Sequence, residues 1–110
     1  MAKPDSCGLG PAFQVVGGKW KALILWWVCQ EPRRFGELKR LVPEISEKML
    51  IQTLREMESD GLVHREVFHQ VPPRVEYSAT KLGISLDQAL VPLALWGQKY
   101  AKRLEAAQER

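Results

Sequence analysis

Three side chains that can bind the edges of base pairs recur at helical spacing in one short segment. At about 100° per residue, Lys48, Gln52 and Arg55 fall on one face of a helix. Ile51 lies on the same face, where no core requirement explains an apolar side chain. Basic and amide side chains bind base edges in the major groove, and an apolar side chain contacts the methyl group of thymine. The chemistry that this face predicts is recognition of double-stranded DNA.

Two acidic residues on the same face, Glu47 and Glu58, keep a second interpretation open. A carboxylate repels phosphate, and a polar helix face is most often only a solvated face. The face therefore suits either double-stranded DNA or a protein partner.

The helix that would carry this face has recognisable ends and a distinct core side. Ser46 is of the type that caps a helix N-terminus, Glu47 suits the first turn, and Asp60-Gly61 ends the helix. We expect the opposite side to be buried; it consists of Leu50, Thr53, Leu54 and Met57. These features predict a well-bounded helix of about fourteen residues with one polar face.

A shorter amphipathic helix precedes this one along the chain. Its apolar residues begin at Phe35 and end at Val42, and Pro43 stops it. A turn of about four residues then leads to Ser46. Two helices at this spacing are typical of a helix-turn-helix, in which the second helix enters the major groove.

Two segments of alternating residues, 62–69 and 74–80, follow the second helix and predict two antiparallel strands. The pair Pro72-Pro73 cannot donate to a strand ladder, so it must lie in the connecting loop and stiffen it. His69 and Arg74 flank this loop, which suits a DNA-binding wing that holds positive groups near phosphates. A plain hairpin turn with an incidental arginine is the alternative.

Helices are also expected at both ends of this unit. After Gly17-Gly18, a helix with apolar residues on opposite sides, Trp26 among them, should be buried on two sides. From Leu82 the apolar residues alternate in steps of four and three: Leu82, Leu86, Ala89, Leu93, Trp96 and Tyr100. A second copy of the chain is the simplest cover for this seam, although packing against Trp26 would absorb part of it. Pro92 lies inside the segment and should kink or restart the helix.

The sequence offers little for catalysis or metal binding. It contains no Gly-rich phosphate loop, no G-x-S-x-G turn and no H-E-x-x-H motif. Four residues are of metal-ligand type but lack the close spacing of a zinc site: Cys7, Cys29, His64 and His69. We therefore predict no enzyme, no cofactor and no metal site, and we expect Cys29 to be a small buried hydrophobe.

The whole chain has the size and composition of one domain. Its 110 residues are 45% hydrophobic, enough for a single core, and its net charge of +3 permits an anionic partner without requiring one. The first ten residues lack the apolar region of a secretion signal, and the longest apolar run is too short to span a membrane. Two cysteines agree with a reducing compartment, so we expect a cytoplasmic protein with no membrane partner.

Three stretches together resemble the HxlR family of bacterial winged-helix (MarR-like) transcription regulators. They are GGKWKALIL, RRFGELKRLVPEISEKMLIQTLREMESDGLVHREV and VPPRVEYSATKLGISL, and Cys7, thirteen residues ahead of Trp20, and Trp96-Gly97 fit the same pattern. The resemblance covers about residues 7–97 and is specific because order and spacing match together. It implies a mainly α fold with a small β-hairpin (α+β), a winged helix-turn-helix with N- and C-terminal dimerisation helices.

The resemblance also implies a layout and partners for the single domain 1–110. The layout is an N-terminal arm (1–17), helices that include the helix-turn-helix (18–61), a wing hairpin (62–80) and a C-terminal dimerisation helix (81–110). The implied protein is a transcriptional regulator that binds an inverted-repeat operator as a homodimer. The expected DNA contacts are Ser46, Glu47, Lys48, Ile51, Gln52, Arg55, His69 and Arg74. The alternative is a winged-helix module that binds protein and not DNA.

Cys7 is a further position to which the resemblance assigns a role. Several regulators of this family use a cysteine at this place to sense quinones, other electrophiles or oxidants. The segment SCGLGPAF would place the thiol in a polar, accessible arm. Relatives usually carry proline after this cysteine, whereas this chain carries Gly8, which makes the local backbone looser.

Overall fold

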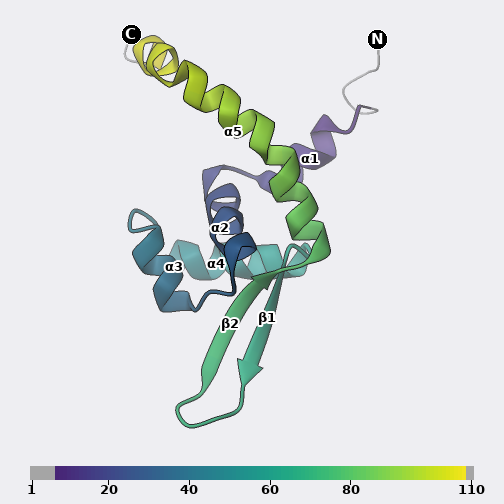
Figure 1. Ribbon diagram of the computed structural model, residues 1–110, viewed down its shortest axis with the longest axis vertical. Coiled ribbons are helices and arrows are strands. Elements are labelled where there is room, and N and C mark those ends of the chain that lie inside the picture. The colour runs from purple at the N-terminus through teal and green to yellow at the C-terminus, as the bar shows by residue number, and fades with distance from the viewer. Residues whose placement is uncertain (1–6, 109–110) are drawn as a thin grey trace.

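The computed structural model describes residues 7–108, which form five helices and one hairpin of two strands. In chain order they are α1 (Leu9–Val16), α2 (Lys19–Gln30), α3 (Phe35–Leu41), α4 (Glu47–Ser59), β1 (Val63–Phe68), β2 (Arg74–Ala79) and α5 (Lys81–Gln108). The predicted class is confirmed: the fold is a mainly α winged helix-turn-helix. The hairpin and α5 extend in opposite directions from a body formed by α2, α3 and α4 (Figure 1). Within residues 7–108, no helix has both the length and the apolar character that crossing a bilayer requires.

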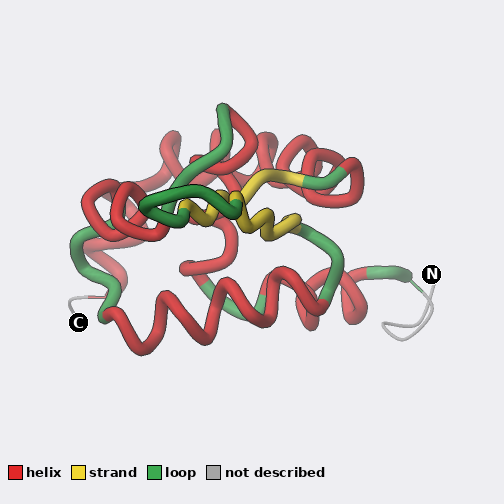
Figure 2. The backbone as a smooth tube through the Cα atoms, turned by 90° about the horizontal axis from the view of Figure 1, so that it is seen from below, coloured by secondary structure: helices red, strands yellow, loops and turns green. Residues whose placement is uncertain are grey.

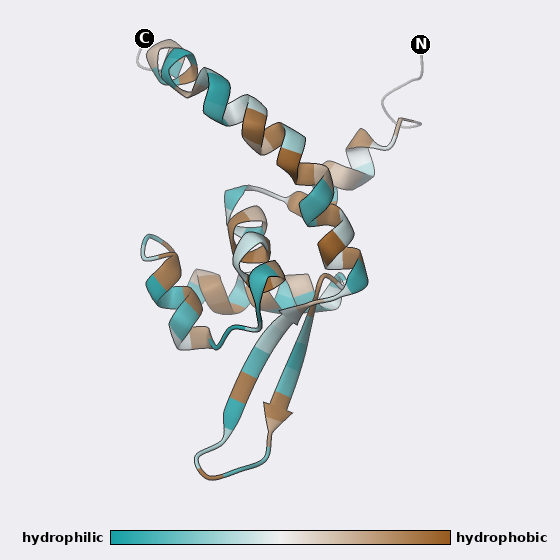
Figure 3. Cartoon of the chain, viewed as in Figure 1, coloured by the Kyte–Doolittle hydropathy of each residue, from teal (hydrophilic) through white to brown (hydrophobic). Residues whose placement is uncertain are grey.

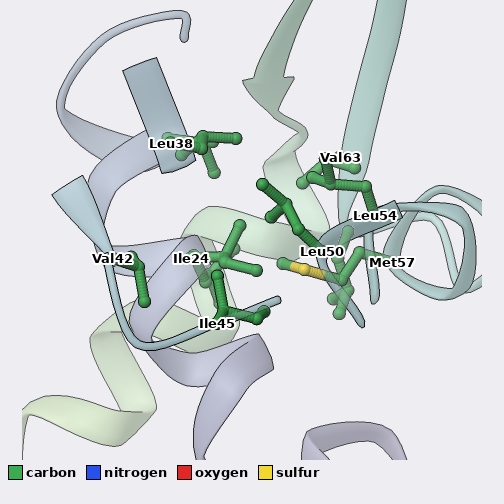
Figure 4. Close-up of a cluster of buried hydrophobic side chains, with 11 residues drawn as sticks. Ile24, Leu38, Val42, Ile45, Leu50, Leu54, Met57 and Val63 are labelled. Carbon is green, nitrogen blue, oxygen red and sulfur yellow. The ribbon is translucent and has the colours of Figure 1, made fainter. Parts of the chain in front are cut away.

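The hydrophobic core lies where α2, α3, α4 and the start of β1 meet. Ile24 of α2, Leu38 of α3 and Leu50 of α4 are fully buried. Figure 4 shows their side chains together with those of Val42 and Ile45, which lie at the turn between α3 and α4. Full burial of a side chain of this size stabilises a fold by about 1.5–3 kcal/mol. The cluster therefore fixes how the two helices of the helix-turn-helix sit against each other.

α4 begins and ends where the sequence predicted. The Ser46 Oγ accepts a hydrogen bond from the Met49 amide at 3.1 Å, which is the N-cap contact. At the other end, Gly61 adopts a left-handed backbone with φ of 78°, and the Leu62 amide donates to the Met57 carbonyl at 2.9 Å. The predicted core side is the buried one: Leu50, Thr53, Leu54 and Met57.

The two strands pair in the antiparallel arrangement that their alternation predicted. The opposed pairs are Val63 and Ala79, His64 and Ser78, Arg65 and Tyr77, Glu66 and Glu76, Val67 and Val75, Phe68 and Arg74. Because side chains alternate across a strand, the face on which Val63 is buried also carries Arg65 and Tyr77, whereas Arg74 shares the other face with Phe68. Figure 2 looks from the side of the hairpin tip and shows the strands surrounded by helices.

Arg33, just ahead of α3, joins the base of the hairpin to the helices. Its backbone exchanges two hydrogen bonds with that of Tyr77, with N···O distances of 2.9 and 2.8 Å. Its guanidinium donates to the Trp27 carbonyl at 3.1 Å and pairs with Glu31 at 3.1 Å. Arg33 therefore helps to fix the direction in which the hairpin leaves the helix-turn-helix, through contacts with α2, β2 and the α2–α3 loop.

α5 begins at a cap that also ties it to the chain before β1. The Thr80 Oγ1 accepts from the Gly83 amide at 3.0 Å and donates to the Gly61 carbonyl at 2.5 Å. The Thr80 backbone amide donates to the Leu62 carbonyl at 3.1 Å. A Cβ at Gly83 would collide with the Leu62 carbonyl oxygen, so only glycine permits this approach. α5 does not restart at Pro92, because the missing hydrogen bond leaves the rest of the helical ladder intact. Its path changes direction partway along its length in Figure 1.

Helix α1 occupies residues 9–16 of the segment expected to be an arm. The resemblance implied an N-terminal helix, but the residues themselves did not predict one, because Gly10 and Pro11 are poor helix formers. Proline is nevertheless tolerated in the first turn, where its missing N–H has no helical partner. Gly17 ends the helix in a left-handed conformation, and its amide donates to the Phe13 carbonyl at 2.9 Å.

The expectation that α2 is buried on two sides is met only in part in the single chain, where Ile24 and Val28 are buried on one side. Leu25 is buried, whereas Trp26 is 49% exposed and Leu23 is exposed beside it. The reason is that α5 covers only part of this side of α2. An apolar surface that the sequence assigned to the core is therefore open in the monomer.

Candidate nucleic-acid interface

The outer face of α4 is the first part of the candidate interface. All predicted contacts at its start and along it are exposed: Ser46, Glu47, Lys48, Ile51, Gln52 and Arg55. Ile51 is 41% exposed, so the core does not account for it. Within residues 7–108, no carboxylate forms an ion pair with Lys48 or Arg55. This face of α4 therefore presents to solvent two cations that form no ion pair within residues 7–108, together with the apolar side chain of Ile51.

A hollow of about 330 Å³ lies between this face and the hairpin. Its walls are formed by Ile51, Leu54, Arg55, Glu58, Arg65 and Tyr77. Arg65 comes from β1, is exposed, and forms no ion pair with any residue that the structure describes. The alternating pattern of residues 62–69 showed which residues share a strand face with Arg65. It did not show that α4 packs against that face, so sequence reasoning missed Arg65. Two arginines thus border one hollow, with Glu58 as their acidic neighbour.

The two residues predicted at the hairpin tip have different surroundings. His69 is exposed in the loop after β1. Arg74 lies with its guanidinium 4.1 Å from the centre of the Phe68 ring, and its Nε is 3.3 Å from Glu76 Oε2. Arg74 is therefore partly neutralised and occupies the hairpin face opposite to Arg65. The structure brings the α4 contacts together with Arg65 but does not bring Arg74 to them.

A chain of polar contacts links α2 to the outer face of α4. The Gln52 Nε2 donates to Glu56 Oε1 at 3.2 Å, and Lys21 Nζ lies 3.2 Å from Glu56 Oε2 and 3.7 Å from Asp60 Oδ2. The hydrogen bond from Gln52, followed by the hydrogen bond and charge of Lys21, lowers the pKa of Glu56 below its ordinary value. Glu56 therefore remains a carboxylate at neutral pH, and its contact constrains Gln52 on the exposed face of α4.

The two cysteines differ in their environments. Cys7 is exposed just before α1. Cys29 is half-buried in α2; burial, aided by the negative charge of Asp87, raises the pKa of its thiol to about 11. Within the described part of the chain, no three His, Cys, Asp or Glu side chains gather as a metal site would need. Cys29 is thus close to the packed hydrophobic role that was predicted for it.

A second surface lies at the other end of the molecule, on α1, α2 and α5. A groove of about 510 Å³ runs between α2 and α5, and it is lined by Ala22, Leu23, Trp26, Asp87, Leu90, Val91, Ala94, Leu95 and Gln98. Beyond the groove, Leu93 and Trp96 of α5 and Phe13 of α1 are more than half exposed. Figure 3 shows apolar residues in brown along α5, where it extends away from the body of the domain. This surface has the character of a helix-packing interface that is uncovered in one chain.

Comparison with known proteins agrees with this arrangement. The model of the HxlR-like helix-turn-helix family matches residues 15–105. The HTH-type transcriptional regulator YkvN of Bacillus subtilis (strain 168) is 52% identical over 101 residues, which are 92% of this chain and 86% of that relative.

Solved structures extend the similarity to the three-dimensional fold. The redox regulator HypR in its reduced form superposes with a TM-score of 0.83 at 42% identity, over 89% of this chain and 97% of that one. The reduced form of the transcriptional regulator YodB from B. subtilis superposes with a TM-score of 0.76 at 31% identity, over 91% of this chain and 96% of that one. The chain therefore belongs to the HxlR-like helix-turn-helix family, and it is a helix-turn-helix transcriptional regulator, not an enzyme.

Proposed function

We propose that this regulator binds a specific double-stranded DNA operator as a homodimer, with α4 in the major groove. The observation that carries the proposal is the exposed face of α4, where Lys48 and Arg55 form no ion pair within residues 7–108 and Ile51 is open to solvent. The major groove is about 12 Å wide and admits one helix. A cation without an intramolecular partner binds DNA without first breaking an ion pair.

The hairpin supplies contacts of a different kind. Arg65 beside α4, and His69 and Arg74 nearer the tip, would contact phosphates or the flanking minor groove. Such contacts hold the protein on the duplex without reading sequence. Base selection then falls to the side chains of α4, chiefly Lys48, Gln52 and Arg55.

The shape of the chain supports a dimer. Its radius of gyration is 16.0 Å, whereas a compact chain of this length has roughly 13 Å. The excess comes from the hairpin and from α5, which extend in opposite directions from the body. α5 carries exposed apolar residues such as Leu95 and Trp96. A second copy would cover this surface and place two α4 helices on an inverted repeat, with their centres roughly 34 Å apart.

Binding to a protein partner in place of DNA is the competing function, because Glu47 and Glu58 lie on the same exposed face. The deciding experiment is an electrophoretic mobility assay with the DNA upstream of the protein's own gene. Wild type should retard this DNA in excess competitor, Arg55→Ala should lose most of that specificity, and Lys102→Ala on α5 should behave as wild type. Retardation of all DNA alike, or of none, would refute sequence-specific binding.

We also propose that Cys7 makes DNA binding responsive to electrophiles or oxidants. Its exposure and its position just before α1 support this role, because α1 belongs to the proposed dimer surface. HypR and YodB, the structural relatives, are known in reduced and in oxidised or diamide-treated forms. A change at Cys7 would alter the spacing of the two α4 helices and release both half-sites together.

Cys29 provides the matched control for Cys7. With a pKa of about 11, only about 1 in 10,000 of its thiols is ionised at pH 7, and the thiolate is the nucleophile. Titration with a quinone should release wild type and Cys29→Ser from DNA but leave Cys7→Ser bound. Release of Cys7→Ser at the same dose as wild type would remove the sensor role.

A further inference from the structure

We propose that Gln52 recognises an adenine in the major groove, and that Glu56, anchored by Lys21 of α2, holds the Gln52 amide in the orientation that this requires. The inference rests on the DNA binding proposed above and assigns a base preference and two positioning residues within it.

The orientation of Gln52 follows from the chemistry of its neighbour. An ionised carboxylate accepts hydrogen bonds and cannot donate them, whereas the glutamine amide carries two N–H donors and one carbonyl acceptor. The nitrogen of Gln52 must therefore face Glu56 Oε1, and it does so at 3.2 Å. The reversed amide would place two oxygens against each other.

One N–H and the carbonyl of Gln52 remain available after this contact. Adenine offers the matching pair in the major groove: its N7 accepts a hydrogen bond and its N6 amino group donates one. Guanine offers two acceptors, cytosine a single donor, and thymine one acceptor with a methyl group. Adenine is thus the base that satisfies both remaining groups of Gln52 at once.

Glu56 is itself held from outside α4. Its second oxygen, Oε2, lies 3.2 Å from the Nζ of Lys21, whose side chain is only 14% exposed. The same ammonium group lies 3.7 Å from Asp60, which closes α4. Because Lys21 belongs to α2, the packing of α2 on α4 fixes the carboxylate, and the carboxylate fixes the amide. Glu56 and Lys21 act as positioning residues and need not touch DNA.

Glu56→Gln is the sharpest test of this chain of contacts. The new side chain has the same shape, but its amide both donates and accepts, so it no longer dictates which way Gln52 points. Gln52→Ala removes the reading group itself. Lys21→Met releases the carboxylate, while Lys21→Arg keeps a cation at the same place and provides the rescue.

The measurement is the affinity of each variant for a set of duplexes in which every base pair of one operator half-site is replaced in turn. Wild type should lose about tenfold or more when one particular A·T pair is replaced, the range expected for a good bidentate contact. Gln52→Ala, Glu56→Gln and Lys21→Met should lose this preference at that pair alone, and Lys21→Arg should retain it. Affinity for unrelated DNA should change little in Glu56→Gln, and the variant should still unfold in one cooperative transition, which separates positioning from folding.

Three outcomes would overturn the inference. If Glu56→Gln keeps the full preference, Glu56 does not position Gln52. If Gln52→Ala keeps it, or if the sensitive pair is G·C, Gln52 is not an adenine reader. Failure of wild type to prefer any sequence would instead refute the DNA-binding proposal itself, so the two failures are distinguishable.

Discussion

Arg65 should be a stronger phosphate contact than Arg74, and the salt dependence of operator binding measures the difference. Arg65 borders the hollow beside α4 and has no ion pair within the described chain. Arg74 is 3.3 Å from Glu76 and lies against Phe68 on the other hairpin face. A cation that already has a carboxylate partner releases fewer counterions from DNA when it binds.

The expected magnitude follows from the positive charge that each substitution removes from the DNA-binding surface. Each phosphate neutralised by a protein cation contributes about 0.9 to the slope of log affinity against log salt concentration. Arg65→Ala removes one such cation from each of two subunits, so the slope should fall by about 1.8. Between about 50 and 200 mM KCl, the affinity ratio of wild type to variant should therefore shrink about twelvefold. Arg74→Ala should change the slope by clearly less.

Fluorescence anisotropy with a labelled operator, titrated at several KCl concentrations, provides the slopes. Lys102→Ala, an exposed cation on α5, is the control and should leave the slope unchanged. An unaltered slope for Arg65→Ala, or a larger effect of Arg74→Ala, would show that the hairpin meets the DNA by its other face. A change in the preferred sequence would show that Arg65 reads bases.

Three further predictions concern stability and assembly. Gly83→Ala should lower the free energy of unfolding by at least about 1–3 kcal/mol, because the added Cβ meets the Leu62 carbonyl. Thermal melts would check this, with Gly36→Ala as the control, since a Cβ at Gly36 makes only ordinary contacts. Leu95→Asp should raise the dimer dissociation constant at least about a hundredfold in sedimentation, since each of two copies loses about 1.5–3 kcal/mol of burial; an unchanged dimer would place the interface elsewhere. The lowered pKa of Glu56 stabilises the folded chain above its ordinary pKa of 4.5, and this contribution is lost as the pH falls through the lowered value. The difference in unfolding temperature between wild type and Glu56→Gln should therefore shrink from about pH 6 to about pH 3, and a constant difference would contradict the pairing.

Local chemistry explains why much of the fold was predictable. Ser46, Pro43 and Gly61 act within a few residues of themselves, so the ends of the helix-turn-helix follow from the sequence around them. The alternation that predicted the strands is a property of the backbone and survives any tertiary context. The same holds for the separation of α4 into a buried and an exposed side.

Long-range packing decided what the sequence left open. Trp26 looked like a core residue because apolarity does not say which neighbour will cover it, and α5 covers it only in part. Thr80 and Gly83 have no distinctive sequence signal, because their roles depend on α5 beginning against the Leu62 carbonyl.

The sequence by itself determined the kind of molecule: a winged helix-turn-helix with base-reading residue types on α4. Only the tertiary structure decided which cations lie beside that helix. Strand register and helix packing place Arg65 next to Arg55 and place Arg74 on the opposite face of the hairpin. It likewise decided that Gln52 is held by Glu56 and Lys21, since a contact between α2 and α4 depends on how two helices cross. Periodicity assigns a side chain to a face of its own element, whereas the partner across that face is set by the packing of the whole domain.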